Sequence, residues 1–394
     1  PPDLVAVSRR LAADAAAVRG SNPALARRLS LAAFRAHDTA EADQALFASV
    51  LPVAATTVAM PTTDTVSVAL RPDGRLMATA GTDRTVRLTM LAGPGRPTSA
   101  ATIDGFEAAV TAVAFSPDGR TVAAANKNTT RLIDVSDPKR PRIVATLVGH
   151  ISPVEAVAFS PDGTLLATGS DDRTARLWNI RDRAHPAFIE SLTGHFGPVT
   201  AVAFASTGHL AATAGIDGQT RVWNVANPKS PVEVSVVMGA SGAINSVAFS
   251  PSGRLLATGV DDGTTRLLDI TDPAHPRQVA SVAAHSARVT GVAFAGRLLF
   301  TSGLDGTVTV HDTTVEQTPA LLMTLPAVPG GIEAIAISGD ASTLATGDDN
   351  RTAIVRPLSA AELAAAACAD PANRPDTKLW TDYAPQVTNP PAAC

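Results

Sequence analysis

Two groups of polar residues in the middle of the chain contain the residue types of a hydrolytic triad. Each group holds a histidine, a threonine, an aspartate and a tryptophan in the same spacing. The groups are His150, Thr168, Asp172 and Trp178, and His195, Thr213, Asp217 and Trp223. A hydroxyl, an imidazole and a carboxylate are the parts of an activated nucleophile. A nucleophile is expected once, whereas this set recurs, so we predict buried structural hydrogen-bond networks and no catalytic residue.

Motifs of other chemistries are absent from the sequence. It contains no P-loop, GxGxxG, HExxH or CxxC motif, so we predict no cofactor and no metal. The turns at Asp171-Asp172 and Asp261-Asp262 are acidic, but they lack the ligand count of a calcium-binding loop. His185 and His275 stand in matching Ala-His-Pro segments, which indicates a recurring loop rather than ligation. We therefore expect that the chain is not an enzyme.

One pattern recurs seven times with a period of 43 to 45 residues. The copies start at Thr65, Val110, Val154, Val199, Ile244, Val289 and Ile332. In the third copy VEAVAF alternates like a half-buried strand, SPDG is a turn, and TLLATGS and TARLWNI are further strands. A variable segment supplies a fourth strand, and four antiparallel strands form one propeller blade. We predict an all-β fold, a seven-bladed β-propeller over residues 51–358.

The last copy ends with its third strand, near Thr352–Leu358. The missing fourth strand must come from elsewhere in the chain. The segment Pro52–Met60 precedes the first copy and has the composition of a strand. We expect it to complete the seventh blade, so that the two ends of the repeat region meet in one sheet.

The repeat resembles the WD40 family in its Gly-His pairs, its Ser-Pro-Asp-Gly turns and its Trp-Asn pairs, which stand where Trp-Asp is usual. The turn aspartate of the family corresponds to Asp83, Asp172, Asp217, Asp262 and Asp305, with Asn128 and Asn350 in its place in two blades. Blades one, two, five and seven lack the histidine or the tryptophan, and we expect them to be looser. The resemblance implies a rigid ring that presents loops to a protein or peptide.

In this family the loop after each Gly-His position lies at one rim of the channel. The corresponding positions here are Glu107, Ile151, Phe196, Ser241 and Ser286. We predict that they form a partner-binding rim, with Phe196 as the most informative member. The alternative for Phe196 is that its ring packs locally on the adjacent blade.

Residues 1–50 have helical patterns, including a helix start at Asn22-Pro23 and a capping pattern at Asp38–Glu41. We expect a helical hairpin that packs on the propeller, and the compatible functional alternative is a helical connector from an upstream domain. Residues 359–394 begin with the helical segment SAAELAAAAC and continue as a Pro-rich tail that buries too little apolar surface to order itself. We expect this tail to pack on the propeller.

The amino-terminal helices and the tail resemble the C-terminal WD40 region of actinobacterial proteins that join a STAND-type nucleotide-binding domain, a membrane helix and a propeller. This resemblance implies that the chain is the sensor end of a signalling protein, with an upstream NTPase or effector domain as a partner. Because the sequence begins at Pro1, without Met or a signal-peptide pattern, we expect a fragment of a longer protein.

The amino-acid composition limits the classes of partner and the cellular compartment that we expect for this chain. The net charge is −4, there is one Tyr and no run of basic residues, so we expect no nucleic-acid partner. No apolar run reaches the length of a membrane span. The two cysteines, Cys368 and Cys394, both lie in the tail, and we predict a disulfide between them. A disulfide and the second resemblance favour the extracytoplasmic face of a membrane-anchored protein, the alternative being reduced thiols in the cytoplasm.

The sequence therefore predicts a non-catalytic protein- or peptide-binding scaffold or sensor module within a larger signalling protein. One alternative is a structural or autoinhibitory propeller that restrains an upstream effector domain. Another is a propeller enzyme with a site in its central channel, although no acid–base or metal cluster in the sequence supports it.

Overall fold

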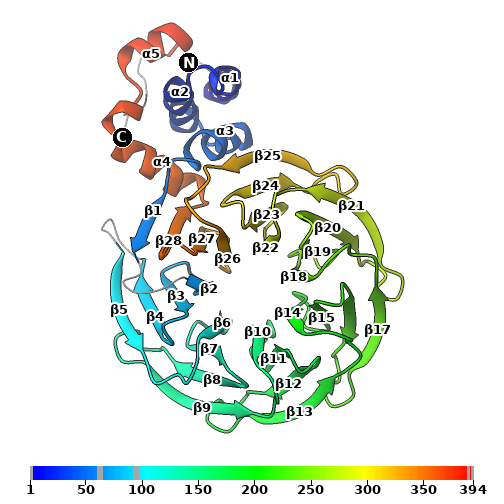
Figure 1. Ribbon diagram of the computed structural model, residues 1–394. Helices are drawn as coiled ribbons and strands as arrows, with labels where there is room; N and C mark the ends of the chain where they lie inside the picture. The colour runs from blue at the N-terminus through cyan, green and yellow to red at the C-terminus, as the bar shows by residue number, and fades with distance from the viewer. Residues whose placement is uncertain (1–2, 60–64, 92–96, 388–390, 392–394) are drawn as a thin grey trace. The chain divides into compact units, whose positions relative to one another are not determined.

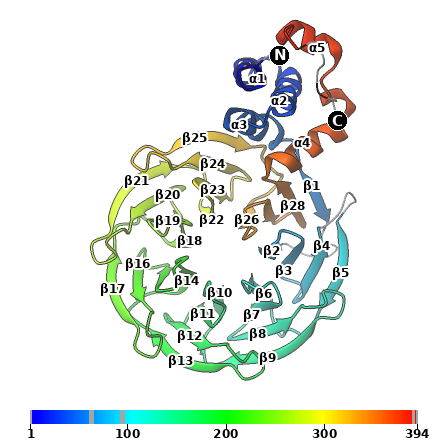
Figure 2. The ribbon, with the colours of Figure 1, turned by 180° about the vertical axis from the view of Figure 1, so that it is seen from behind.

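The computed structural model describes residues 3–59, 65–91, 97–387 and 391 of the chain. Within these residues, seven four-stranded sheets stand around a common centre, and Figures 1 and 2 show the ring from its two faces. The innermost strands of consecutive blades contact one another around the ring. The predicted seven-bladed β-propeller is confirmed.

The strands of each blade are given from the centre of the ring outward. Blades one to three contain β2 (Thr65–Leu70), β3 (Leu76–Gly81), β4 (Val86–Met90) and β5 (Thr98–Ile103); β6 (Val110–Phe115), β7 (Thr121–Asn126), β8 (Thr129–Asp134) and β9 (Arg142–Val148); β10 (Val154–Phe159), β11 (Leu165–Ser170), β12 (Ala175–Asn179) and β13 (Ala187–Leu192). Blades four and five contain β14 (Val199–Phe204), β15 (Leu210–Gly215), β16 (Thr220–Asn224) and β17 (Val232–Val237); β18 (Ile244–Phe249), β19 (Leu255–Val260), β20 (Thr264–Asp269) and β21 (Arg277–Ala283). Blades six and seven contain β22 (Val289–Ala295), β23 (Leu298–Gly303), β24 (Val308–Asp312) and β25 (Ala320–Leu325); β26 (Ile332–Ile337), β27 (Thr343–Asp348), β28 (Thr352–Pro357) and β1 (Thr56–Ala59).

The Ser-Pro-Asp-Gly turn joins the first strand of a blade to the second. In blade three, the Ser160 hydroxyl donates to Asp162 (2.6 Å), and the Asp162 carboxylate accepts from the Thr164 backbone N–H (3.0 Å). Gly163 has a φ of +68°, a conformation that favours glycine. These local bonds fix the reversal of the chain before the buried second strand begins.

Stacking of neighbouring blades buries both faces of each second strand. In β11, Leu166 packs against Leu132 of blade two, and Ala167 packs against Val199 of blade four. Every residue of β11 is buried as a result. A single blade could not bury both faces, which is why the ring is needed for stability.

Each innermost strand carries a β-bulge at its second residue, and in four blades this residue ties its blade to the next. The register shift lies, for example, between Val154 and Ala156. The bulge side chains donate to the main-chain carbonyl that begins the next innermost strand: Thr111 to Val154 (2.5 Å), Thr200 to Ile244 (2.5 Å), Asn245 to Val289 (3.0 Å) and Thr290 to Ile332 (2.6 Å). Sequence alternation did not predict these inter-blade bonds.

The seventh blade closes the ring with strands from both ends of the repeat region. Strand β1 joins the outer edge of β28, in the order β1-β28-β27-β26. An apolar cluster containing Val58, Leu70 and Val355 lies between the last blade and the first. The predicted closure by the segment Pro52–Met60 is therefore confirmed for its residues Thr56–Ala59; Met60 lies outside the described residues.

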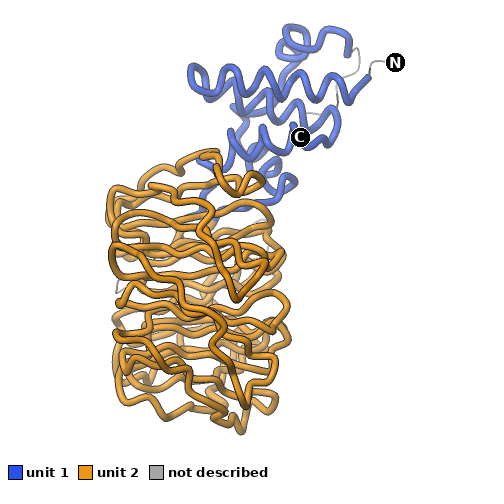
Figure 3. The backbone as a smooth tube through the Cα atoms, turned by 90° about the vertical axis from the view of Figure 1, so that its right-hand side faces the viewer, with its two compact units in different colours: residues 1–56, 356–394 blue, residues 57–355 orange. Residues whose placement is uncertain are grey.

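The chain divides into two compact units, residues 57–355 and residues 1–56 with 356–394, which Figure 3 colours separately. The second unit contains α1 (Leu4–Val18), α2 (Pro23–Ala36), α3 (Ala40–Val50), α4 (Ala360–Ala369), the 3-10 helix η1 (Pro371–Asn373) and α5 (Thr377–Tyr383). The helix start predicted at Asn22-Pro23 is present, because the Asn22 side chain accepts from the Leu25 N–H (3.0 Å). Among the described helices, none is long and apolar enough to cross a membrane.

The tail differs from the sequence expectation. We expected little helix after α4, yet the tail forms α5 and shares one hydrophobic core with the amino-terminal helices. That the tail packs on the propeller stays a prediction. Leu379 and Trp380 are buried in this core together with Leu11 and Leu29. The tail and the amino-terminal helices therefore belong to one compact unit, in which two large apolar side chains of the tail complete the helical core.

Candidate functional site

In blade three the four predicted network residues form one chain of hydrogen bonds. The Trp178 indole Nε1 donates to Thr168 Oγ1 (3.0 Å), Thr168 Oγ1 lies 2.8 Å from His150 Nε2, and His150 Nδ1 lies 2.7 Å from Asp172. An indole N–H can only donate and a hydroxyl has one proton. Donation therefore runs from Trp178 through Thr168 and His150 to the carboxylate. Blade four repeats this chain with Trp223, Thr213, His195 and Asp217.

In this network the protonation states of the histidine and the aspartate are set by their surroundings, and no hydroxyl that could act as a nucleophile is exposed. Thr168 and Thr213 are each 1% exposed, so neither hydroxyl can reach a substrate. Burial lowers the pKa of His195 although the Asp217 carboxylate opposes this, so the imidazole is neutral at pH 7. Burial raises the pKa of Asp217, but the Phe196 N–H and His195 outweigh it and the net pKa is lowered. A neutral histidine therefore donates to an ionised aspartate.

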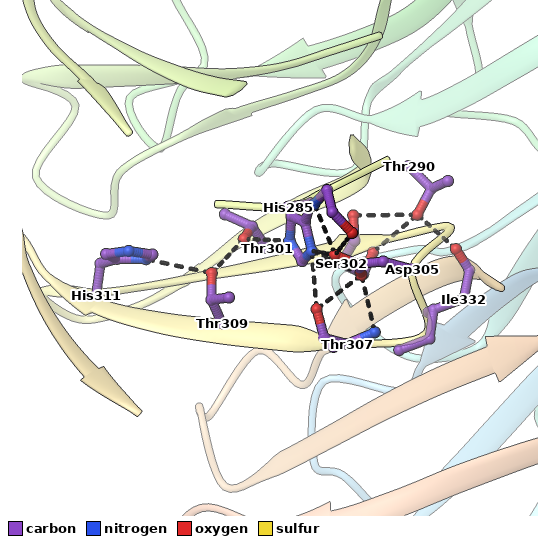
Figure 4. A network of polar contacts seen from close by, with 10 residues as sticks. His285, Thr290, Thr301, Ser302, Asp305, Thr307, Thr309, His311 and Ile332 are labelled. Carbon is purple, nitrogen blue, oxygen red and sulfur yellow. Dashed lines mark hydrogen bonds and ion pairs between the residues drawn. The ribbon is translucent and has the colours of Figure 1, made fainter. Parts of the chain in front are cut away.

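A third network in blade six was missed at the sequence level. His285 Nε2 lies 2.8 Å from Thr301 Oγ1, and His285 Nδ1 lies 3.0 Å from Asp305 (Figure 4). The chain continues from Thr301 to Thr309 (2.7 Å) and on to His311 Nδ1 (3.4 Å). The only signal was a histidine 20 residues before the turn aspartate, without the glycine and tryptophan of the motif.

His311 occupies the strand position of the missing tryptophan. It pairs with Leu299 as Trp178 pairs with Leu166. Thr309 bridges the gap that a ring smaller than indole leaves between His311 and Thr301. Blade six therefore preserves a relay of polar contacts with different residues.

The glycine of each Gly-His pair provides room for an arginine. A Cβ atom on Gly194 would lie 2.5 Å from Arg221 Nη1, and one on Gly149 would overlap Arg176 Nη1. Arg221 Nη2 also donates to the Gly194 carbonyl (2.6 Å). Blade six has Ala284 in place of the glycine and Thr309 in place of the arginine, so the two positions change together. The glycine therefore precedes the histidine because the arginine side chain leaves no room for a Cβ atom, and no reactive role for the Gly-His pair is needed.

In blades two and seven, residues other than those predicted make the bonds expected of the turn aspartate. We expected Asn128 and Asn350 to replace the turn aspartate. In blade two the turn is shorter, and Asn126 accepts from the Glu107 N–H (3.2 Å). In blade seven Asp348 accepts from the Asn350 N–H (3.1 Å) and the Thr352 N–H (2.8 Å). In both blades the polar side chain comes from the end of the second strand, but Asn126 holds the loop before the innermost strand, whereas Asp348 holds the turn.

Four of the five predicted rim residues are anchored by their backbone N–H groups, and the fifth, Ser241, by its hydroxyl. The backbone N–H groups of Ile151, Phe196 and Ser286 donate to Asp172 (3.2 Å), Asp217 (2.9 Å) and Asp305 (2.9 Å). The Glu107 N–H is held by Asn126, and the Ser241 hydroxyl donates to Asp262. All five residues are exposed, and the two large apolar ones among them, Ile151 and Phe196, have 85% and 74% of their surface accessible to solvent. Most of the surface of Phe196 is therefore left uncovered by the adjacent blade.

Two further exposed apolar residues, which were not predicted, lie in or beside the turn of blade four. Ile216, in the turn beside Asp217, is 53% exposed, and Met238, after β17, is 67% exposed. A Cβ atom on Gly197 would lie 3.6 Å from Ile216 Cβ, and one on Gly218 would lie 3.6 Å from Ala240 Cβ. The loops that carry Phe196 and Met238 thus flank the blade-four turn. We call Phe196, Ile216 and Met238 the rim patch.

The remaining predicted sites give no reactive cluster in the described part of the chain. There, no three His, Cys, Asp or Glu side chains gather as metal ligands. His185 and His275 each lie 2.9 Å from an aspartate of their own loop, Asp182 and Asp272. Cys368 lies in α4, and Cys394 lies outside the described residues, so the bridge between them stays a prediction.

A groove of about 700 Å³ lies between blades three and four, at the ends of the strands away from the rim. Its charged side chains include Asp162, Arg181 and Lys229. The Asp162 carboxylate is occupied by Thr164, whose backbone N–H and hydroxyl both donate to it. None of the predicted rim residues lines this groove.

Seven four-stranded blades whose turns are held by recurring polar networks define a repeat-built β-propeller. The chain belongs to the WD40 family: the family described as WD domain, G-beta repeat matches residues 57–89, 97–134, 141–179, 187–224, 232–269 and 276–312. Each matched segment begins in or just before the outer strand of one blade and ends in the third strand of the next, which is the offset that ring closure requires. A search of curated proteins found no match.

Proposed function

We propose that this WD40 propeller is a non-catalytic scaffold that binds a protein or peptide at its rim patch. One observation carries the proposal. The Asp217 carboxylate holds both the buried His195 and the Phe196 backbone N–H, while the Phe196 side chain stays 74% exposed. The buried network therefore fixes the main chain of a residue whose apolar side chain has no cover of its own.

An exposed aromatic side chain on a fixed main chain favours the binding of a partner for two energetic reasons. Aromatic side chains dominate binding energy when a partner buries them. A main chain that is already fixed loses little conformational entropy on binding, so more of the contact energy appears as affinity. Ile151, anchored in the same way on blade three, extends the surface beyond the rim patch.

Peptide selection tests this function. We expect the immobilised chain to enrich peptides from a random displayed library, and Phe196→Ala to weaken their binding by about tenfold or more, the effect of losing a hot spot. Leu321→Ala is the matched control, because Leu321 is 58% exposed on the outer strand β25. Equal binding by wild type and Phe196→Ala would contradict the proposal.

We propose further that the propeller is the sensor part of a larger signalling protein and faces an oxidising compartment. The resemblance of its flanking segments to membrane-anchored STAND-type proteins supports this, as does the confinement of both cysteines to the tail. Labelling of Lys139→Cys, in an exposed loop, by a membrane-impermeant reagent in intact cells tests the compartment. Protection from the reagent until the cells are lysed would place the domain in the cytoplasm.

The disulfide has its own test. We expect the denatured, unreduced protein, made under oxidising conditions, to contain no titratable thiol, because Cys368 and Cys394 are bridged. A bridge closing a loop of this length contributes about 3 kcal/mol, mainly by restricting the unfolded chain. Cys368→Ser should lower the melting temperature under oxidising conditions and not under reducing ones. Two titratable thiols per chain would refute the bridge.

A further inference from the structure

Two sets of positions surround the mouth of the channel at the rim. One is the bulge residue of each innermost strand, and the other is the first residue of each turn between the second and third strands. In the second set, Asp171, Ile216 and Asp261 donate their backbone N–H groups to the residue that precedes the innermost strand. Both sets therefore lie beside the start of the strands that line the channel (Figure 1).

These positions are rich in carboxylates, which we call the mouth carboxylates: Glu155, Asp171, Asp261, Glu333 and Asp349. The single basic residue at these positions is Lys127, whose Nζ lies 3.3 Å from Glu107. Further basic residues lie nearby: Arg84, Arg173 and Arg351 stand in the turns of blades one, three and seven, and Arg288 directly precedes β22. At the two sets of positions themselves, five carboxylates stand against one basic residue.

The carboxylates of blade three repel one another. Burial and then the charge of Asp171 raise the pKa of Glu155, and burial and then the charge of Asp172 raise the pKa of Asp171. The other bulge residues that are Thr or Asn donate a bond to the next blade, which a Glu155 carboxylate cannot do. A cation brought by a partner would relieve this repulsion.

Ile216 joins this charged mouth to the rim patch. It belongs to the rim patch, and it also occupies the mouth position of blade four, between Asp171 of blade three and Asp261 of blade five. An apolar side chain docked on the rim patch therefore has a carboxylate on each neighbouring blade. We propose that the ligand is a peptide segment in which an apolar side chain is flanked by lysine or arginine. This inference rests on the proposed function and names its partner class.

Three fluorescent peptides of one length test the inference, each with a central leucine flanked by lysine, glutamine or glutamate. We expect the lysine peptide to bind the full chain about tenfold more tightly than the glutamine peptide, and the glutamate peptide to bind most weakly. Added salt should weaken the lysine peptide selectively. The double variant Glu155→Gln/Asp171→Asn should bring the affinity of the lysine peptide toward that of the glutamine peptide.

Asp182→Asn is the matched control, since it removes an exposed carboxylate at the other end of the strands. Asn227 holds the equivalent loop in blade four by the same backbone bond, so the substitution preserves the fold. Equal affinities for all three peptides, with Phe196→Ala still weakening them, would overturn the charge preference and leave the proposed function intact. Binding that Phe196→Ala does not change would instead refute the rim patch as the site. Loss of lysine-peptide binding in Asp182→Asn would also overturn the inference.

Discussion

His195→Ala is expected to lower the free energy of unfolding by about 1–3 kcal/mol, the usual cost of leaving buried polar groups without partners. The substitution removes the acceptor of the Thr213 hydroxyl and the side-chain donor to Asp217. The His195 side chain is fully buried, so the vacated volume adds a packing cost. Denaturant unfolding of the purified chain measures the change.

His209→Ala is the control for this experiment, because His209 lies in the same blade and is exposed. We expect no more than a small change in stability from it. Hydrolase assays on both variants complete the test. Unchanged stability in His195→Ala, or a hydrolytic activity lost with the histidine, would refute a structural role for the network.

The same substitution should also reduce peptide binding. The Asp217 carboxylate accepts hydrogen bonds from both the His195 imidazole and the Phe196 N–H. Without the imidazole, this carboxylate can rotate away from the Phe196 N–H. Binding at a temperature where the variant remains folded separates this effect from unfolding. Retained affinity would show that the Phe196 main chain is held without the network.

Acidification is expected to destabilise the propeller between pH 6.5 and pH 4. Burial, followed by the charge of His285, lowers the pKa of His311 to about 4, whereas the unfolded chain titrates near 6.5. Below pH 6.5 the unfolded state therefore takes up a proton that the folded state resists. The difference between the two pKa values corresponds to a loss of about 3 kcal/mol by pH 4. Burial also lowers the pKa of His150 and His195, which adds to the loss.

The aspartates of the networks do not account for this window. The pKa of Asp305 is lowered to about 2, so its stabilising contribution is lost only as the pH falls below the unfolded value of 3.8. We expect His311→Gln, which keeps an N–H donor and does not titrate, to flatten the dependence of stability on pH between 6.5 and 4. His185→Gln is the control, because the His185 side chain is 84% exposed. An identical pH dependence in wild type and His311→Gln would contradict the assignment.

The amino-acid sequence alone determined the features that depend on short stretches of chain. The period of 43 to 45 residues predicted seven blades, because each copy contains four strands and the turns between them. The Ser-Pro-Asp-Gly turns and the helix start at Asn22 depend on bonds between residues a few positions apart, such as Ser160 with Asp162. The orphan third strand near Thr352–Leu358 predicted that Pro52–Met60 would close the ring, since every blade needs a fourth strand.

The tertiary structure decided whatever depends on side chains that meet through space. The blade-six network uses His311 and Thr309 in place of tryptophan, and a motif cannot show that different residues fill the same volume. The rim patch exists because two loops and a turn converge on blade four, although Phe196, Ile216 and Met238 lie in three separate segments. The tail orders because Leu379 and Trp380 enter a core built by the other end of the chain. Burial depends on which surfaces are brought together, and the periodicity of one segment does not contain that information.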